Sequence, residues 1–588
     1  MVNLTINKQA ISVPEGTTIM EAALNAGIEI PHLCYLKDLN EIGACRLCSV
    51  EVEGEPKLVP ACDSLVREGM AVTTNSARVR GAMRTNLELL LSQHDCKCTT
   101  CVRSGNCQLQ TMANDAGILG DTYEKELPAG RLAQWDGSFP LIRDAAKCIK
   151  CMRCIQVCDK VQSLGVWDFA GIGSRTHVSV AEGGCIKDAD CSLCGQCITH
   201  CPVGALRERD DVQKVLADVA DPDVVTVIQI APAVRTAFGE GFGLSPEQAT
   251  VNRLAGALHQ VGFDYVFDTT FSADLTIMEE GTEFLTRLQK GELAQYPMFT
   301  SCCPGWIRFI KSQFPQLVGQ LSTAKSPQQM FGAVVKSYFA SKIGVAPEKI
   351  RCISVMPCVA KKSECDLPTM ADANGIRDVD YVLTTREVVR MLRAEHLDME
   401  QVAERPFDSI LGDYTGAGVI FGATGGVMEA ALRTAAYIVT GKNPAPDAFS
   451  AVRACALPDG SQAPWREAVY DVAGTPVRVA VASGLGNARK LCEAILAGDV
   501  KYDFVEIMAC PGGCSGGGGQ PIHCDDVERA ATRGDVLYDI DRTMALRFSH
   551  ENPDVQALYK DALGKPLSHC AEELLHTDHF GWDMPKKA

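Results

Sequence analysis

The sequence predicts a multidomain protein in which small α+β iron–sulfur modules precede a larger α/β domain. The chain has 588 residues, and this length predicts roughly three to five domains. Its 28 cysteines are too small a fraction of the chain for a small disulfide scaffold, but they are many for an ordinary intracellular enzyme. Many of them fall in closely spaced runs that are typical of cluster ligands. After residue 222, strand-like and helix-like segments alternate, which is the pattern of an α/β domain.

Residues 1–77 are predicted to form the first module, a small mixed sheet with one helix. Apolar and polar residues alternate at Val2–Ile6, Ala10–Val13 and Cys48–Val52, as they do in strands. Thr17–Ala26 has the pattern of a helix.

Four cysteines of this module form a candidate [2Fe–2S] site. They are Cys34, Cys45, Cys48 and Cys62, separated by ten, two and thirteen residues. A plant-type [2Fe–2S] domain has C-x4-C-x2-C and a distant fourth cysteine, so the longer first gap is a departure. A [2Fe–2S] cluster is the preferred interpretation, and a zinc ion or no metal is the alternative.

Residues 78–117 carry a second candidate site, made by one histidine and three cysteines in the pattern His94-x3-Cys98-x2-Cys101-x5-Cys107. One imidazole and three thiolates are also a common zinc set, so spacing alone does not separate zinc from a [4Fe–4S] cluster. The position between other cluster motifs favours the cluster, because a redox-inert ion would interrupt electron transfer. Cys96 is the competing ligand, and we interpret it as a bystander.

Residues 138–211 contain two cysteine runs with the spacing of a two-cluster ferredoxin. In each run three close thiolates hold one [4Fe–4S] cluster, and the fourth reaches across to the other cluster. The predicted ligand sets are Cys148, Cys151, Cys154 and Cys201 for one cluster, and Cys158, Cys191, Cys194 and Cys197 for the other. In chain order, the three [4Fe–4S] sites are expected in series behind the first module.

Composition limits the partners and the location. The net charge of −17 argues against nucleic acid, whose phosphates bind basic surfaces. No apolar run approaches the roughly 18–20 residues that span a bilayer, and no export signal is visible at the N-terminus. We therefore expect a cytoplasmic protein without a membrane partner, in a reducing compartment that suits thiolate ligands.

The predicted α/β domain covers residues 222–535 and follows a break at Asp221-Pro222. One of its helices is expected over Gln328–Tyr338, with Ser326 as the N-cap and Pro327 at the first helical position. Its expected strands are Val224–Ile230, Gly262–Phe267, Arg351–Met356, Arg478–Val481 and Phe504–Met508.

Three cysteine-bearing loops lie at the ends of these elements: Thr300–Trp306 (TSCCPGW), Met356–Lys362 (MPCVAKK) and Met508–Pro521 (MACPGGCSGGGGQP). In these loops and in Ser549–Pro553, the chain resembles [FeFe]-hydrogenases. Taken alone, the modules before residue 211 resemble the electron-input arm of respiratory complex I as much as that of [FeFe]-hydrogenases. The order of modules and the length are similar to those of the catalytic subunit of NADP-reducing, multimeric hydrogenases and of monomeric clostridial enzymes.

The resemblance implies that the α/β domain is a catalytic domain with an H-cluster. It implies a [4Fe–4S] cubane and a diiron unit that carries CO, CN⁻ and an azadithiolate. The implied ligands of the cubane are Cys303, Cys358, Cys510 and Cys514, of which Cys514 also bridges to the diiron unit. Lys361 is implied beside a cyanide ligand, with Ser326 and Gln328 as hydrogen-bond donors. The implied apolar wall, for which ordinary core packing is the alternative, is Ala231, Pro232, Met356, Phe421 and Met508.

The resemblance also implies a proton route. It starts at Cys302 and passes through Glu280, Ser322 and Glu283 to end near Arg287. The spacing independently places Glu280, Glu283 and Arg287 on one helical face. The alternative interpretation is a stripe of surface salt bridges.

The implied activity is reversible H2 oxidation and proton reduction, with accessory clusters that pass electrons to or from a partner. The implied partner is an NAD(P)-binding flavoprotein subunit or ferredoxin, beside [2Fe–2S] partner subunits and maturation proteins. The glycine turn at Gly484–Gly486 does not predict a nucleotide site, because Arg489 replaces the small residue of the dinucleotide fingerprint. An H2 sensor and a non-catalytic electron carrier or assembly protein are the alternatives.

Residues 536–588 are predicted to be a helical segment that resembles a hydrogenase small subunit. Met544–His550, Val555–Leu563 and Ala571–His576 have helical patterns. In the family such a segment wraps the catalytic domain or forms a separate chain.

Overall fold

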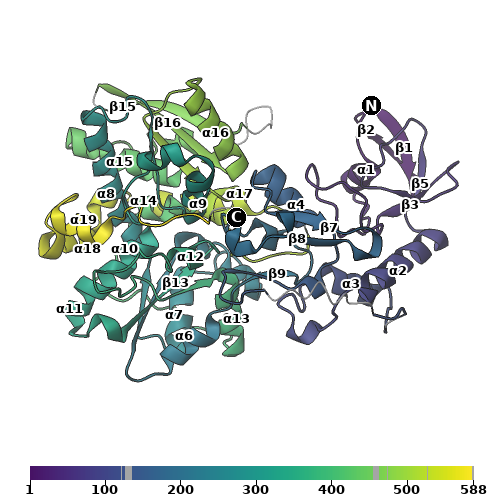
Figure 1. The fold of residues 1–588 in the computed structure, drawn as a ribbon, viewed down its shortest axis with the longest axis horizontal. Coiled ribbons are helices and arrows are strands. Elements are labelled where there is room, and N and C mark those ends of the chain that lie inside the picture. The colour runs from purple at the N-terminus through teal and green to yellow at the C-terminus, as the bar shows by residue number, and fades with distance from the viewer. Residues whose placement is uncertain (121, 126–134, 454–462, 473, 526, 586–588) are drawn as a thin grey trace.

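The computed structural model describes residues 1–585 except 121, 126–134, 454–462, 473 and 526. Three parts follow one another along the long axis of the molecule (Figure 1). The first module lies at one end, residues 138–211 lie in the middle, and a larger part with two sheets forms the other end. The C-terminal helices α18 (Pro553–Leu558) and α19 (His569–Leu575) lie on the far side of the larger part.

The first module is a five-stranded sheet with one helix, as predicted. Its strands pair in the order β2-β1-β5-β3-β4. Helix α1 (Ile19–Asn25) starts with a capping box, in which Thr18 accepts the Glu21 N–H and Glu21 accepts the Thr18 N–H. The strands are β1 (Val2–Ile6), β2 (Gln9–Val13), β3 (Ser49–Val52), β4 (Val59–Pro60) and β5 (Ala71–Thr73).

The middle part has few regular elements because its backbone bends around the cysteine runs. Met152 and Gly195 both adopt left-handed backbone angles directly after a cysteine, and a one-turn helix follows each of them. The two helices are α4 (Arg153–Gln156) and α5 (Gln196–Thr199), and α2 (Ala77–Ser92) and α3 (Gln108–Asp115) precede them. Two antiparallel pairs complete this part: β6 (Leu141–Arg143) with β9 (Leu206–Glu208), and β7 (Trp167–Ala170) with β8 (His177–Val180).

The larger part is built on two four-stranded sheets. The first sheet is parallel and has the order β11-β10-β13-β14. Its strands are β10 (Val225–Ile230), β11 (Tyr265–Asp268), β13 (Ile350–Met356) and β14 (Tyr381–Thr384). The second has the order β12-β17-β16-β15, in which only β15 is antiparallel. Its strands are β12 (Met298–Phe299), β15 (Arg466–Val472), β16 (Thr475–Ser483) and β17 (Phe504–Met508). The five predicted strands are confirmed. They were recognisable in the sequence because a strand that is buried on both faces is apolar along nearly its whole length.

Helix α8 (Thr270–Gln289) contributes to the cores of both sheets. Its Phe271 packs in the core of the first sheet and its Phe284 in that of the second. It contacts α10 (Pro327–Val334) and α15 (Gly426–Thr440) along its length. The other helices are α6 (Val212–Val219), α7 (Val251–Val261), α9 (Pro304–Gln313), α11 (Ala340–Ile343), α12 (Lys361–Glu364), α13 (Thr385–Ala394), α14 (Gly416–Val419), α16 (Leu485–Ala497) and α17 (Ala530–Thr543).

The expected helix over Gln328–Tyr338 is confirmed as α10, which continues in a π-turn over Val335–Phe339. Ser326 lies at its N-cap position, as expected. However, the Ser326 hydroxyl donates to Glu364 Oε2 at 2.9 Å instead of capping the helix.

The prediction of a helix over Met544–His550 is wrong except for its last two residues, which begin a 3-10 turn at Ser549–Glu551. Tertiary hydrogen bonds hold the rest of the segment out of a helix. The Leu546 carbonyl accepts the Gly416 N–H at 2.9 Å, and the Arg547 carbonyl accepts the Arg433 guanidinium at 3.0 Å. The two later helical patterns do correspond to α18, with its π-turn at Tyr559–Leu563, and to α19.

The glycine turn between β16 and α16 packs against the middle part. The Leu485 N–H donates to Gln162 Oε1 at 2.9 Å, and a Cβ atom on Gly486 would lie 2.7 Å from the Val161 carbonyl oxygen. The Arg489 guanidinium donates to the Ser163 carbonyl at 2.9 Å. Residues 161–163 therefore fill the space in front of this turn.

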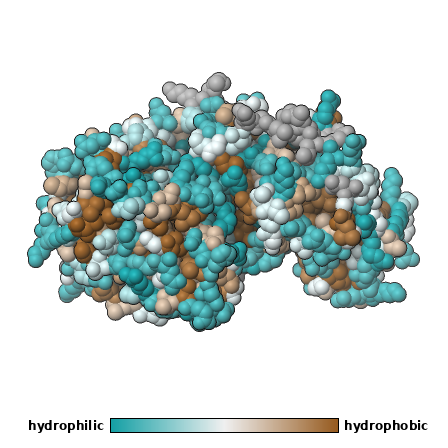
Figure 2. All heavy atoms as spheres, turned by 90° about the horizontal axis from the view of Figure 1, so that it is seen from below, coloured by the Kyte–Doolittle hydropathy of each residue, from teal (hydrophilic) through white to brown (hydrophobic). Residues whose placement is uncertain are grey.

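Hydrophilic residues dominate the face shown in Figure 2, and its hydrophobic residues form small separate groups. Within the described residues, none of the helices has the length and apolar character needed to cross a membrane.

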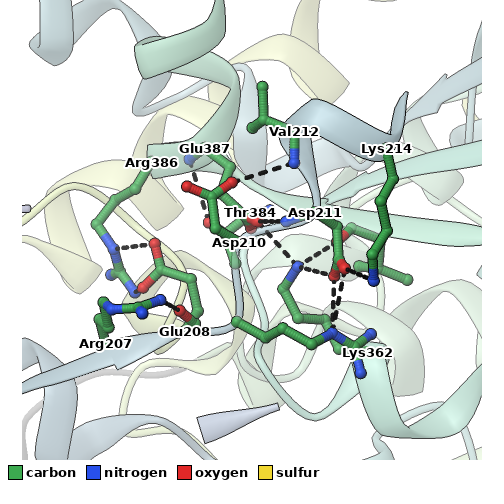
Figure 3. Close-up of polar contacts among 12 residues, drawn as sticks. Arg207, Glu208, Asp210, Asp211, Val212, Lys214, Lys362, Thr384, Arg386 and Glu387 are labelled. Atoms are coloured by element: carbon green, nitrogen blue, oxygen red, sulfur yellow. Dashed lines mark hydrogen bonds and ion pairs between the residues drawn. The ribbon is translucent and has the colours of Figure 1, made fainter. Parts of the chain in front are cut away.

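A buried charge cluster fastens the middle part to the larger part (Figure 3). The ammonium of Lys362, on α12, donates to Asp211 Oδ2 and to Glu387 Oε1 at 3.0 Å each, and all three side chains are buried. Glu387 Oε1 also accepts the Asp211 N–H at 3.0 Å. We call these three residues the Lys362 cluster. Beside it, Arg386 of α13 pairs with Glu208 of β9 at 2.6 Å.

Replacement of Lys362 by alanine is expected to destabilise the protein by about 3–5 kcal/mol, because the buried Glu387 carboxylate loses the cation that it pairs with and Asp211 loses one of its cations. The matched control is Lys214→Ala. Lys214 also pairs with Asp211, but its side chain is 57% exposed, so the expected loss is below about 1 kcal/mol. Urea unfolding followed by circular dichroism measures both variants. Equal midpoints for the two variants would contradict the role of the Lys362 cluster.

Candidate active site and metal centres

The first module buries its four cysteines around one site. Cys34, Cys45 and Cys48 precede β3, Cys62 follows β4, and all four are buried. Cys34 interacts with Cys45 and Cys62, and Cys62 with Cys48. The hydrogen bond with Cys62 lowers the pKa of the Cys48 thiol. Four converging thiols have the donor chemistry of an iron–sulfur cluster.

The His94 site lies where residues 94–107 meet the middle part. Nδ1 of His94 lies 2.9 Å from the Lys147 carbonyl oxygen, which leaves Nε2 for a metal. Burial lowers the pKa of His94, so the neutral, metal-binding form of the ring is favoured. Cys107 is brought close to Cys101. The Cys96 thiol donates to the His94 carbonyl at 3.4 Å.

The middle part contains two cavities whose walls match the predicted ligand sets. One is lined by Cys148, Cys151, Cys154 and Cys201. The other is lined by Cys158, Cys191, Cys194 and Cys197. Among the described residues, no three His, Cys, Asp or Glu side chains form a group suited to a single metal ion. Each cavity gathers four thiols, the donor set of a [4Fe–4S] cluster, and Cys158 and Cys201 each line the cavity of the other run.

A further set of four cysteines meets at the carboxyl ends of the strands. Cys303 follows β12, Cys358 follows β13, and Cys510 and Cys514 follow β17. The Cys514 thiol interacts with the other three, and burial raises the pKa of Cys514 well above its ordinary value. Since ligands of open α/β sheets bind beyond the carboxyl ends of the strands, this is the expected position of a catalytic site. The four thiols suit a cubane held from three distant loops.

Glycines allow two of these loops to meet. A Cβ atom on Gly517 would collide with the Pro357 carbonyl, and one on Gly519 would lie 2.8 Å from the Pro357 carbonyl carbon. The run of glycines therefore lets the loop that carries Cys510 and Cys514 lie against the loop that carries Cys358.

Lys361 points toward the same site and is held by a carboxylate that the sequence analysis missed. Its ammonium lies 2.9 Å from Glu364 Oε2 and 3.1 Å from the Cys302 carbonyl oxygen. Burial opposes its charge, but Glu364 raises the pKa of Lys361 and keeps it a cation. Ser326 and Gln328 also donate to Glu364 Oε2, at 2.9 and 3.2 Å. The one sequence signal for Glu364 was its position three residues after Lys361.

The five predicted wall residues are all buried, but they fall in different core clusters. Phe421 and Met508 pack in the cluster that Cys302, Cys303 and Cys514 border. Met356 and Ala231 belong to the core cluster that Cys358 borders, and Pro232 is buried beside Ala231. Both groups lie around the cysteine set.

Three of the five predicted relay residues lie on α8, and the structure brings all five into a line. The Ser322 hydroxyl donates to Glu283 Oε2 at 2.9 Å, and Arg287 pairs with Glu283 at 2.6 Å. Burial, and next the Glu280 carboxyl, raise the pKa of the Cys302 thiol well above its ordinary value. Burial also raises the pKa of Glu280 to about 8, while interactions with the Ser322 hydroxyl and the Ser301 backbone lower it. Both groups lie beside the buried carboxyl, although neither makes a hydrogen bond of ordinary geometry with it.

Two accessory sites contact the same cysteine set of the middle part, whereas chain order predicts a simple series. The Asn40 amide donates to the Cys34 carbonyl at 2.7 Å and to the Cys151 carbonyl at 2.8 Å, so the first module touches the middle part directly. The His94 site touches the same cysteine set from another side, since Cys107 Sγ lies 3.9 Å from the Pro202 carbonyl oxygen. Cys510 Sγ lies 3.6 Å from the Cys194 carbonyl oxygen, which links the middle part to the larger part.

Family models match along the chain in the order of these sites. They are a 2Fe-2S iron-sulfur cluster binding domain (1–77), the NADH-ubiquinone oxidoreductase-G iron-sulfur binding region (84–120), a 4Fe-4S dicluster domain (147–205), the C-terminal domain of the iron only hydrogenase large subunit (224–518) and the iron hydrogenase small subunit (527–582). Together they define an iron hydrogenase large subunit with accessory iron–sulfur domains in the same chain.

Individual relatives agree with the family models. The chain is 46% identical to the NADP-reducing hydrogenase subunit HndD of Solidesulfovibrio fructosivorans, over 99% of both chains. It is 37% identical to iron hydrogenase 1 of Clostridium pasteurianum, over 98% of this chain and 99% of that one. The solved structure of apo [FeFe]-hydrogenase HydA1 from Chlamydomonas reinhardtii matches with a TM-score of 0.56 and 41% identity, over 64% of this chain and 100% of that chain. The chain belongs to the [FeFe]-hydrogenase family and is an oxidoreductase.

The pKa of Glu280 predicts a pH-dependent stability. Its pKa rises from 4.5 to about 8 on folding, so between these values the folded protein holds a proton that the unfolded chain has lost. Stability therefore falls as pH rises through this window. Glu280→Gln is expected to show a smaller fall, measured as urea midpoints at pH 5 and pH 8. Glu573→Gln, at a side chain that is 71% exposed, is the control. Parallel curves for wild type and Glu280→Gln would contradict the assignment.

Proposed function

We propose that this [FeFe]-hydrogenase interconverts H2 with two protons and two electrons at an H-cluster held by Cys303, Cys358, Cys510 and Cys514. The observation that supports this best is the Cys302 thiol, which lies beside both the cysteine set and the buried Glu280 carboxyl. When bound, the H-cluster supplies an open iron and an electron pair, and its diiron unit carries CO, CN⁻ and an azadithiolate. Cys514 would hold both the cubane and the diiron unit.

The protein's own groups then orient the centre and exclude water. The Lys361 ammonium balances the charge of a cyanide, while Ser326 and Gln328 hold Glu364 and through it Lys361. The apolar wall keeps the site dry, so that these electrostatic contacts stay strong. The wall residues are Ala231, Pro232, Met356, Phe421 and Met508.

Protons travel along the line of side chains described above. Cys302 holds or releases the proton nearest the iron, and the Glu280 carboxyl exchanges it with the Ser322 hydroxyl. Ser322 in turn donates to Glu283. A Glu280 pKa of about 8 suits this task, because proton transfer is most efficient when the pKa of the group is near the working pH.

Electrons enter through one [2Fe–2S] cluster and three [4Fe–4S] clusters, the latter including one held by His94, Cys98, Cys101 and Cys107. The contacts of the first module and of the His94 site with the middle part support two entry points, which meet at the cluster of Cys148, Cys151, Cys154 and Cys201. The electron partner is an NAD(P)-binding flavoprotein subunit with its [2Fe–2S] partner, or ferredoxin. The relative named as a subunit of an NADP-reducing hydrogenase supports this partner. A reducing cytoplasm is the compartment that suits thiolate ligands.

Infrared spectroscopy tests the proposed function. Anaerobic protein made with the diiron maturation proteins is expected to show sharp CO and CN⁻ bands under argon that shift under H2. Protein made without these maturation proteins is the matched control and is expected to lack the bands. Their absence in matured protein whose accessory clusters are fully loaded would contradict the H-cluster.

Cys302→Ser is expected to preserve the cluster spectra and to remove nearly all turnover, because a hydroxyl is a far weaker proton donor than a thiol. H2 evolution with a reduced viologen dye measures the loss. Cys185→Ser changes an exposed cysteine and is expected to leave turnover unchanged. Substantial turnover in Cys302→Ser would exclude this cysteine from the proton route.

A further inference from the structure

The proton route needs an acceptor beyond Glu283. Arg287, at the outer end of the route, pairs with Glu283 Oε1 at 2.6 Å. A guanidinium has five donors and no acceptor, and it stays protonated in proteins. Arg287 can therefore orient Glu283, but it cannot carry the proton onward.

A second contact leads from Glu283 to the C-terminal segment. The Thr323 hydroxyl lies 3.2 Å from Glu283 Oε1 and 2.7 Å from His576 Nδ1. A hydroxyl has one proton to donate and two lone pairs to accept with. Thr323 can therefore accept a proton from a protonated Glu283 while it donates its own proton to His576.

Glu279 fixes the ring of His576 in the form that such a transfer needs. Glu279 Oε2 lies 3.1 Å from His576 Nε2 and accepts the Leu567 N–H at 2.9 Å, while Oε1 accepts the Tyr559 hydroxyl. A neutral His576 therefore donates its Nε2–H to Glu279. The lone pair on Nδ1 then faces Thr323.

The C-terminal segment docks closely enough to hold this geometry. The Thr577 N–H donates to the Thr323 carbonyl, and the Lys325 N–H to the Leu575 carbonyl, at 2.8 Å each. His576 thus lies between two backbone hydrogen bonds that join its strand-like segment to residues 323–325.

His576 and Thr323 line a cavity of about 400 Å³ at the protein surface. Its other titratable groups are Arg287, Glu572, Asp578 and His579, and both Glu572 and Asp578 are exposed. His579 does not compete for the proton, because its Nε2 lies 2.8 Å from the Ser322 carbonyl oxygen and burial lowers the pKa of His579. The cavity therefore joins the inner side chains to solvent.

We propose that His576 is the outer proton acceptor of this hydrogenase, linked to Glu283 by the Thr323 hydroxyl and to solvent by the cavity. In the outward step the O–H bond of the Glu283 carboxyl breaks as one forms to the Thr323 oxygen. The original Thr323 proton moves to His576 Nδ1. The imidazolium then loses its Nδ1 proton to solvent in the cavity and keeps its Nε2–H toward Glu279, and no electrons move in either step. The inference rests on the proposed H2 chemistry, and H2 evolution uses the same steps in reverse.

The test compares matured wild-type enzyme with His576→Ala and with the control His569→Ala. His569 is the first residue of α19, the helix that ends directly before His576; its side chain is 84% exposed, and it is outside the route. His576→Ala is expected to lower H2 turnover by at least about a hundredfold, the lower end of the range for loss of a positioned acid–base group. It is also expected to raise the solvent isotope effect in D2O, and added imidazole is expected to restore much of the rate. His569→Ala is expected to match wild type in all three measurements.

Two results would overturn the role of His576. One is unchanged turnover in His576→Ala. The other is a loss that imidazole does not restore, with an unchanged isotope effect, which would mark His576 as a structural residue. The infrared bands of each variant keep this test separate from the proposed function. A wild-type enzyme without CO and CN⁻ bands would contradict the H-cluster, whereas a loaded, inactive His576→Ala that imidazole rescues supports the outlet.

Discussion

The Lys362 cluster is the interaction on which the rest of the arrangement depends. Electron transfer requires the middle part to stay against the catalytic domain, because Cys510 Sγ approaches the Cys194 carbonyl oxygen at 3.6 Å. Buried charges hold this junction, and a buried ammonium is stable only while its carboxylates remain in place. Lys361, the preceding residue of α12, faces the cysteine set through Glu364 instead. One short helix therefore couples the docking of the electron-transfer part to the charge at the active site.

The sequence predicted the features that depend only on short segments of the chain. Cluster ligands lie at fixed short spacings, so the cysteine runs were recognisable one by one, and buried strands such as β10 and β17 are apolar along their whole length. It did not predict Glu364, whose importance comes from donors on α10 that are about 36 residues away in the chain. Met544–His550 has a helical pattern, but its carbonyls are taken by Gly416 and Arg433. Contacts between distant segments override local propensity in each of these cases.

The electron path shows the same limit on a larger scale. Chain order suggests a series of clusters, yet the buried Asn40 amide joins the carbonyls of Cys34 and Cys151, and the Arg153 guanidinium donates to the Tyr35 carbonyl. The His94 site approaches Pro202 separately. Both sites therefore contact the same cysteine set of the middle part, which is the basis of the two entry points proposed above. Chain order carries no information about this, because it depends on which faces of the folded parts meet.

Burial governs the proton path as well. The ordinary pKa values of a cysteine and a glutamate differ by several units. Burial is the largest cause of the raised pKa values of Cys302 and Glu280, and it favours the protonated form of both groups. Both groups therefore favour the neutral form, in which each can donate a proton to the next group of the proposed route. Toward the surface the groups change in kind, since Glu283 accepts from the Arg287 guanidinium, the Ser322 hydroxyl and the Thr323 N–H. Arg287 has no acceptor atom, so the proposed route needs a base with access to solvent beyond Glu283.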